Sequence, residues 1–185
     1  MPDLVMFAAA LLAAAVATAK PVDVAFDTTA GTFVIRVDTA HAPITASNFL
    51  HNVMRGRYAN GSIYRTVDKH REAASFEVIQ GGVGPSGDPG VTPITLEPTT
   101  KTGLHNDDGA VAMARTNDPN SATTEFFVDL GDARFLDGDG PLAPGYAVFG
   151  HVVRGMDVVR KIHEGSANGE LLSPPVRFLH VHILK

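Results

Sequence analysis

The chain has 185 residues, of which 44% are hydrophobic and 19% charged, a balance that suits one globular domain with a sizeable core. The formal net charge is −5 with no basic cluster to offset it, which excludes a nucleic-acid-binding face and makes an acidic membrane surface a poor partner. Cysteine is absent, so disulfides, thiolate nucleophiles and cysteine-based zinc sites are excluded together.

Residues 1–19 differ in composition from the rest of the chain. Residues 7–17 form an apolar run too short to span a bilayer, and the run ends in a small-x-small cleavage pattern at residues 17–19. We therefore expect residues 1–19 to be a secretory signal peptide, and residues 20–185 to form a periplasmic or secreted domain with no stable membrane association. The segment before the run carries no Lys or Arg, so an uncleaved apolar helix is the alternative.

The next part of the chain combines strands with one helix. Alternating apolar residues predict strands at residues 22–27 and 32–37, joined by a hairpin turn. Residues 43–55 change to helical spacing, with Thr45 as the expected N-cap and Gly56 as the stop.

Residues 62–82 place two polar side chains in apolar surroundings. The segments 62–66 and 76–82 both have strand character, and they carry Arg65 and Gln80 respectively. An Arg among β-branched and aromatic neighbours either extends into water or uses its planar set of donors on a specific partner. A solvated strand arginine is the more common outcome, so Arg65 alone does not define a site.

The second half of the chain is again rich in short strands. Residues 83–108 lack hydrophobic periodicity and are expected to form a surface loop, whereas residues 155–163 have the apolar spacing of a helix. Further strands are predicted at residues 110–115, 125–130, 146–153 and 176–184. About eight short strands and two helices make a mainly β fold, either a small antiparallel barrel or a sandwich closed by helices.

Patterns that could bind a metal are weak. Residues 137–140 look like the start of a calcium loop, but Pro141 follows and no Glu closes the loop. His180 and His182 lie on one face of a predicted strand, as two metal ligands would, but no third ligand stands at a readable spacing. We therefore interpret them as ordinary strand histidines and predict no metal and no cofactor.

Several short motifs, taken together and in order, resemble one family. They are Tyr64-Arg65, Gln80-Gly81-Gly82, Ala112-Met113-Ala114-Arg115, Phe126-Phe127, Phe135-Leu136-Asp137, Tyr146-Ala147-Val148-Phe149-Gly150 and Gly155-Met156-Asp157-Val158-Val159. Over nearly all of residues 22–185 the chain is similar to the cyclophilin-type peptidyl-prolyl cis–trans isomerases. The resemblance implies an eight-stranded closed antiparallel barrel capped by two helices. It also implies a site on the outer barrel face, because so small a barrel fills its interior with side chains.

The resemblance assigns roles to individual positions. Arg65 matches the family's catalytic arginine, and Gln80 matches the glutamine that holds the substrate backbone. The positions that match the walls of the proline pocket are Val78, Phe127, Leu136 and Tyr146, with Phe135 where many eukaryotic members carry Trp. The segment that matches the strand end pairing with an extended peptide is Ala114, Arg115 and Thr116.

The sequence also departs from the family pattern near this pocket. The loop between Arg65 and Gln80 is longer than usual, and Glu77 stands where an aromatic pocket wall is expected. Phe76 could replace that wall by a shift of one residue, although such a shift on a strand points the ring to the opposite face. Glu125 stands where Gln is common, which would add a negative charge beside the substrate backbone.

The expected chemistry is rotation about an X–Pro bond, whose resonance gives a barrier of roughly 20 kcal/mol. A guanidinium aimed at the proline nitrogen weakens that resonance without proton transfer or a cofactor. We expect a monomeric isomerase that acts on proline-containing polypeptide segments and assists the folding of exported proteins. The alternative is a catalytically weak peptide-binding module or chaperone, which Glu77 and the enlarged loop favour.

Overall fold

The structure is a computed structural model that describes residues 20–70, 74–140 and 143–185. The predicted signal peptide, residues 1–19, lies outside the described residues, as does part of the long loop between Arg65 and Gln80. Among the described residues, no helix is long and apolar enough to cross a membrane.

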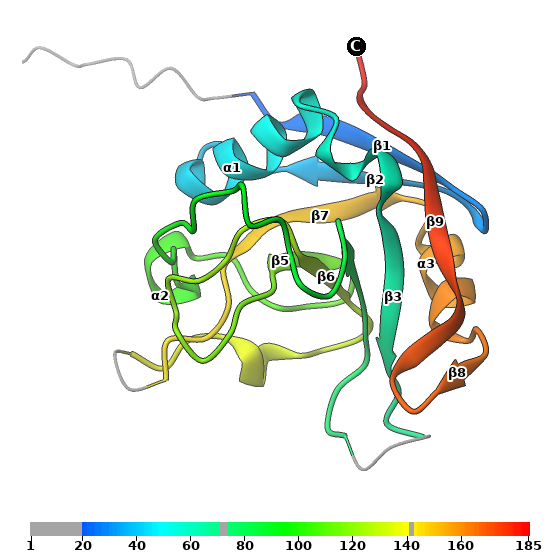
Figure 1. Ribbon diagram of the computed structural model, residues 1–185. Helices are drawn as coiled ribbons and strands as arrows, with labels where there is room; N and C mark the ends of the chain where they lie inside the picture. Colours follow the sequence, from blue (N-terminus) through cyan, green and yellow to red (C-terminus); the bar gives the residue numbers. More distant parts are fainter. Residues whose placement is uncertain (1–19, 71–73, 141–142) are drawn as a thin grey trace, which may run out of the picture.

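Eight strands form one closed antiparallel barrel (Figure 1). They are β1 (Val22–Thr28), β2 (Gly31–Val37), β3 (Ser62–Val67), β4 (Val78–Gly82), β5 (Ala110–Met113), β6 (Phe126–Asp129), β7 (Val148–Arg154) and β9 (Leu171–Ile183). Their order is β1, β2, β7, β5, β6, β4, β3, β9, and pairing between β9 and β1 closes the circle. Closure confirms the predicted barrel and rules out the sandwich. The two-residue strand β8 (Ala167–Asn168) pairs with β9.

Two main helices pack against the barrel and share its core (Figure 1). In α1 (Pro43–Met54) the buried residues include Phe49 and Val53, and in α3 (Met156–His163) they include Val159 and Ile162. The spacing of three or four residues puts each pair on one helix face, as the sequence pattern predicted. Shorter helical pieces lie in the connections: η1 (Arg57–Asn60), α2 (Thr99–Thr102) and η2 (Arg134–Leu136).

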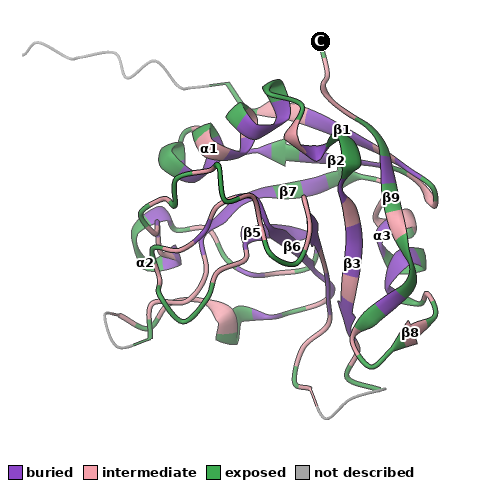
Figure 2. Cartoon of the chain, in the orientation of Figure 1, coloured by how far each residue is buried: buried purple, intermediate pink, exposed green. Residues whose placement is uncertain are grey.

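Aromatic side chains fill the inside of the barrel. Phe26, Phe33, Phe126 and Phe149 are completely buried, and the rings of Phe26 and Phe33 stack with their centroids 5.1 Å apart. Figure 2 shows buried residues along the barrel strands and exposed residues on the outer side of α1 and on the loops. Since the interior holds only side chains, a ligand must bind on the outside of the barrel.

Glu97 caps α1 from a distant part of the chain. Its carboxylate accepts hydrogen bonds from the backbone N–H groups of Ile44 (3.2 Å) and Thr45 (2.7 Å), and from the Thr45 hydroxyl (2.7 Å). The prediction that Thr45 is the N-cap is therefore wrong. The helix begins at Pro43, and Ala42 at the N-cap position has no side-chain oxygen to offer. Glu97 replaces the missing cap, and it is only 2% exposed within a segment predicted to be a surface loop.

We expect Glu97→Ala to lower the free energy of unfolding by about 2–4 kcal/mol, because it leaves buried donors at the start of α1 unpaired. Thr45→Val is the matched control: it removes only the hydroxyl bond and should cost about 1–2 kcal/mol. Urea denaturation followed by circular dichroism measures both losses. An equal loss for the two variants would contradict the capping role.

Candidate active site

A β-bulge in β3 brings two consecutive side chains to the outer face of the barrel. Ile63 pairs with Gly81 on β4, and Arg65 pairs with Gln80, so Tyr64 is the extra residue between them. Ile63 belongs to the core, and regular alternation would turn Arg65 back into the interior. The bulge instead leaves both Tyr64 and Arg65 next to the outward-facing Gln80.

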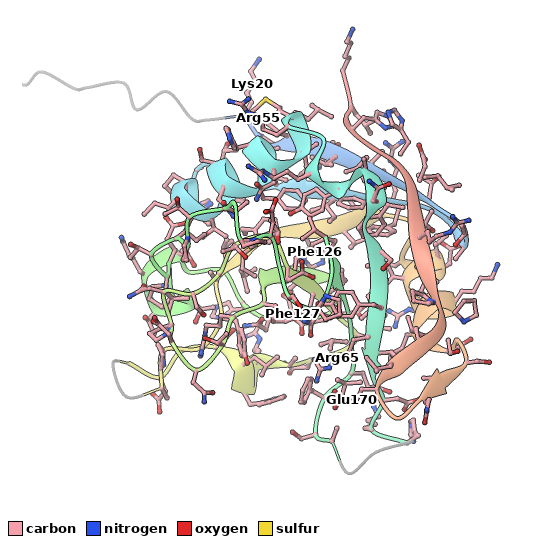
Figure 3. The ribbon with its side chains drawn as sticks, in the orientation of Figure 1. Lys20, Arg55, Arg65, Phe126, Phe127 and Glu170 are labelled. Atoms are coloured by element: carbon pink, nitrogen blue, oxygen red, sulfur yellow. The ribbon has the colours of Figure 1, made fainter. Side chains whose placement is uncertain are left out.

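The Arg65 guanidinium is held from two sides. Its Nη1 donates a 2.6 Å hydrogen bond to Oε1 of Gln80, and its Nε donates a 2.5 Å hydrogen bond to Oε2 of Glu170 in the β8–β9 hairpin. Figure 3 shows Arg65 and Glu170 together near one end of β3. The Arg65 side chain is 30% exposed, so water and solutes reach a guanidinium whose plane is restrained. This is not the freely solvated strand arginine that general statistics favour.

Gln80, Tyr64 and Glu125 continue the network away from Arg65. The Gln80 Nε2 donates to the Tyr64 hydroxyl at 3.1 Å, and that hydroxyl donates to the Glu125 carboxylate at 2.8 Å. A guanidinium only donates and a carboxylate only accepts, so the direction of each bond in the series is determined. Burial, with the Glu125 charge as a second cause, raises the pKa of Tyr64, which keeps its hydroxyl a donor.

A cavity of about 150 Å³ lies beside Arg65 on the outer barrel face. The residues that line it were all assigned to the site from the sequence: Arg65, Phe76, Val78, Gln80, Ala114, Arg115, Phe127, Leu136 and Tyr146. Pockets for drug-sized ligands usually have about 300–1,000 Å³. This cavity therefore suits one small apolar ring with a polar group at its edge, not a large cofactor.

Aromatic contacts fix the walls of the cavity. The rings of Phe127 and Tyr146 are perpendicular, with their centroids 5.2 Å apart. The Arg115 guanidinium carbon lies 4.7 Å from the Tyr146 ring centroid, and its Nε donates to the Gly145 carbonyl at 2.9 Å. These contacts hold Arg115 as part of the cavity wall. The other arginine in the lining, Arg65, instead bonds to Gln80 across the β3–β4 pair.

Phe76, not Glu77, provides the aromatic wall that the sequence left open. β4 begins only at Val78, so residue 76 precedes the strand and the alternation argument against a one-residue shift does not apply. The Glu77 carboxylate forms a 2.8 Å ion pair with Lys69 instead. The charge of Glu77 is thus compensated outside the cavity.

Thr116 and Phe135 do not line this cavity. The Thr116 amide donates to the Ser121 hydroxyl at 2.9 Å, so this N–H is already paired within the chain. Phe135 is 56% exposed and packs on Phe76, with ring centroids 5.6 Å apart. It supports the wall from outside.

Glu125 is not among the residues that line this cavity either. Glu125 is 8% exposed, and besides Tyr64 it accepts bonds from the backbone N–H groups of Val83 (2.9 Å) and Gly84 (3.2 Å). Burial raises the pKa of Glu125, while these donors act in the opposite direction. Its role is to hold the turn after β4.

Glu170 and Asp129 were not predicted from the sequence. Glu170 follows the turn at Asn168-Gly169, a hairpin signal that could have placed it on the strand pair, but the predicted last strand started only at residue 176. Asp129 lies two residues after Phe127 on β6 and pairs with Val78, so its side chain shares their outer face. Asp129 is completely buried, and neither carboxyl oxygen has a hydrogen-bond partner among the described residues.

A larger cavity of about 590 Å³ lies elsewhere, with Pro21, Leu104 and Val153 in its lining. It shares no residue with the cavity at Arg65, and its lining is mainly apolar. We identify the smaller cavity as the candidate active site because the hydrogen-bonded polar side chains at Arg65 converge there, although the other cavity has the larger volume.

Comparisons with known proteins agree with this geometry. Residues 22–183 match the family described as cyclophilin type peptidyl-prolyl cis-trans isomerase/CLD. The peptidyl-prolyl cis-trans isomerase cyp18 of Streptomyces antibioticus is 40% identical over 151 residues, which cover 79% of this chain and 87% of that protein. The peptidyl-prolyl cis-trans isomerase B of Escherichia coli is 38% identical over 148 residues, covering 79% and 86%.

Solved structures support the same fold. The crystal structure of a Cryptosporidium parvum cyclophilin-type isomerase superposes with a TM-score of 0.71 at 18% identity, covering 90% of this chain and 99% of that one. A second structure of that protein, determined in the presence of the dipeptide Ala-Pro, gives a TM-score of 0.70 and covers 88% and 99%. The closed barrel capped by two helices is the fold of these cyclophilin-type isomerases. The chain belongs to the cyclophilin-type peptidyl-prolyl cis–trans isomerase family, and it is an isomerase.

We expect the stability of the protein to fall as pH rises above about 4, because of Asp129. Burial, together with the charges of Asp107 and Asp137, raises the pKa of Asp129 from 3.8 to about 8. Between these values the folded protein keeps a proton that the unfolded chain has released, so each pH unit costs up to about 1.4 kcal/mol. Asp129→Asn removes this titration, and its urea stability relative to the unmodified protein should rise from pH 5 to pH 8. A constant difference between the two proteins would refute the burial of a protonated Asp129.

We expect Glu170→Ala to reduce kcat/KM on a proline-containing peptide by about threefold to tenfold without lowering Tm. The pair is partly exposed, so its loss costs little stability, but the guanidinium loses one of its two restraints. Glu164→Ala, which removes an exposed carboxylate at the end of α3, is the control and should leave kcat/KM unchanged. A faster Glu170→Ala enzyme would show that the carboxylate weakens Arg65 instead of positioning it.

Proposed function

We propose that Arg65 accelerates X–Pro rotation by donating a hydrogen bond to the proline nitrogen. An arginine has five N–H donors, of which the bonds to Gln80 and Glu170 use two. The remaining donors are available to a substrate at the edge of the cavity. A bond to the nitrogen lone pair is strongest when the amide has lost its resonance, so it stabilises the rotated state more than the ground state.

We propose that the cavity at Arg65 receives the proline ring. Phe76, Val78, Phe127 and Leu136 give it an apolar lining, and a ring gripped there would be held while the residue before it turns. The observation that carries the proposal is the placement of a restrained guanidinium at the edge of a small cavity that has apolar side chains in its lining. Proline-containing polypeptide segments are the proposed substrates, by analogy with the Ala-Pro dipeptide named for the Cryptosporidium parvum structure.

The alternative is a weak binding module, which Glu77 and the enlarged loop favoured. Glu77 pairs with Lys69 and Phe76 lines the cavity, so the argument from Glu77 no longer applies, while part of the loop lies outside the described residues. A binding module needs only a cavity that holds the proline ring, whereas here Gln80 and Glu170 also orient Arg65 beside it. This second feature favours catalysis.

We also propose that the protein works outside the cytoplasm, as a monomer that assists the folding of exported proteins. The support is the apolar run at residues 7–17 with its small-x-small end. Expressed in a bacterial host with its native first residues, the mature protein should begin at or near Lys20 and fractionate with the periplasm. N-terminal sequencing tests this. Full-length protein in the cytosol would contradict it.

We expect Arg65→Ala to lower kcat/KM on a Pro-containing peptide by about one to two decades, since a hydrogen bond to a charged group is worth about 1.5–3 kcal/mol. Tm should change little, because Arg65 projects outward and its removal creates no core cavity. Arg65→Lys is the sharper control: it keeps the charge but loses the planar set of donors, and it should rescue little.

The measurement is a protease-coupled isomerase assay together with a thermal melt for each variant. Unchanged turnover in folded Arg65→Ala would show that the arginine is not catalytic. A melt that collapses together with activity would assign Arg65 a structural role.

A further inference from the structure

Asp27, His180 and His182 form a three-residue cluster on the outer face of the barrel, where β1 and β9 meet. The two strands lie side by side in Figure 1, and Asp27 pairs directly with His180 in their antiparallel register. His180 and His182 are two residues apart on β9, so both rings stand on the same face. The ligand atoms that the three side chains offer lie within 4.8 Å of one another. The sequence revealed the two histidines but not the third ligand, because Asp27 lies at the opposite end of the chain.

The geometry of this cluster is not that of hydrogen bonding. Nδ1 of His180 and Nδ1 of His182 lie 3.8 Å and 3.9 Å from the same oxygen, Oδ2 of Asp27. These separations are too long for hydrogen bonds. They are a few tenths of an ångström longer than the roughly 3.3–3.6 Å between two tetrahedral ligands that share one ion at about 2.0–2.2 Å, so a small inward movement of the side chains brings them to ligand positions. The two imidazole rings stack with their centroids 4.4 Å apart, so the two side chains lie next to each other.

The remaining contacts of the cluster also suit an ion. Nδ1 of His182 is buried and has no hydrogen-bond partner among the described residues, which is costly for a polar atom unless something binds it. The second oxygen of Asp27, Oδ1, accepts a 2.7 Å hydrogen bond from the Thr32 hydroxyl on β2. That bond orients the carboxylate with Oδ2 toward the histidines, as outer-shell partners do in metal sites.

We propose that Asp27, His180 and His182 bind a divalent transition-metal ion of the Zn²⁺ class. Two imidazole nitrogens and one carboxylate oxygen are ligands that Zn²⁺ prefers, and water would complete the coordination. Because β1 and β9 are the first and last strands of the barrel, the ion would bridge the seam that closes it. The site is structural: none of its residues lines the cavity at Arg65.

Arg154 sets a limit on the affinity. It lines the same outer depression as Asp27 and His182, so its positive charge opposes a bound cation. We expect Arg154→Gln to tighten metal binding.

The test is isothermal titration calorimetry of the tag-free, EDTA-treated and desalted protein with ZnCl₂, with a parallel titration by CoCl₂ followed by visible absorption. We expect one ion per chain, a Co²⁺ spectrum of mixed nitrogen and oxygen ligation, and a Tm that rises with Zn²⁺ concentration. The rate of X–Pro isomerisation should be the same with and without the ion.

Variants separate this site from adventitious binding. His182→Ala should weaken Zn²⁺ binding at least about tenfold, and Asp27→Asn should do the same while keeping the bond from Thr32. His151→Ala is the matched control, because His151 also faces a carboxylate, Asp107 at 3.7 Å, but belongs to no group of three metal-ligating side chains among the described residues. The control should bind Zn²⁺ as the unmodified protein does.

Three results would overturn the proposal. They are no binding up to millimolar Zn²⁺, equal affinity in His182→Ala and the unmodified protein, or an equal loss in His151→Ala. Each variant is first melted in EDTA. If His182→Ala does not fold, the comparison of Asp27→Asn with the unmodified protein decides.

Discussion

The site depends on the restraint of one guanidinium. A solvated arginine on a strand samples many rotamers, and side-chain entropy then weakens any bond that it makes to a substrate. Here the bulge at Tyr64 turns Arg65 outward, Gln80 accepts from Nη1, and Glu170 accepts from Nε. The restraint is transmitted further, because Gln80 is itself oriented by Tyr64, which in turn donates to the buried Glu125. Much of the polar outer face of β3 and β4 thus serves to aim a single group.

The filled barrel explains why the site lies outside. Stacked phenylalanines such as Phe26 and Phe33 occupy the interior, so the outer face of β3, β4, β5 and β6 must provide the pocket. A second, smaller apolar cluster, which includes Val78 and Phe127, has formed on that outer face, and partly buried Phe76 packs against it. The cavity at Arg65 lies among the side chains of this cluster, in space that no other part of the described chain fills.

The residue pattern alone left a barrel or a sandwich open, and the resemblance to the family decided for the closed barrel. The same resemblance assigned to the site the residues that line the cavity, with Phe76 as the alternative to Glu77. Prediction from the sequence failed where the outcome depends on contacts between distant segments. The alternation of apolar and polar residues could not reveal the bulge at Tyr64. Nor could the local sequence show that Glu97, far along the chain, caps the first N–H groups of α1 in place of an N-cap side chain. Glu170 was missed because a hairpin turn shows that two strands meet but not which side chain reaches across to Arg65. Glu125 aligned with a substrate-binding position, yet nearby backbone donors drew its carboxylate inward.

The buried carboxyl groups near the site differ in how well they are solvated by the protein. Glu125 is surrounded by donors, so burial raises its pKa while hydrogen bonds oppose the rise. Asp129 has no such partner, and burial acts on it with the charges of Asp107 and Asp137 in the same direction. A neutral carboxylic acid is the form that this environment tolerates, and such an acid can donate as well as accept. Since Asp129 shares β6 and its outer face with Phe127, this buried carboxyl group without a hydrogen-bond partner among the described residues lies next to a wall of the pocket. A buried polar group without a partner destabilises the fold locally. Such groups are typical of functional sites, where the rest of the structure compensates for the lost stability.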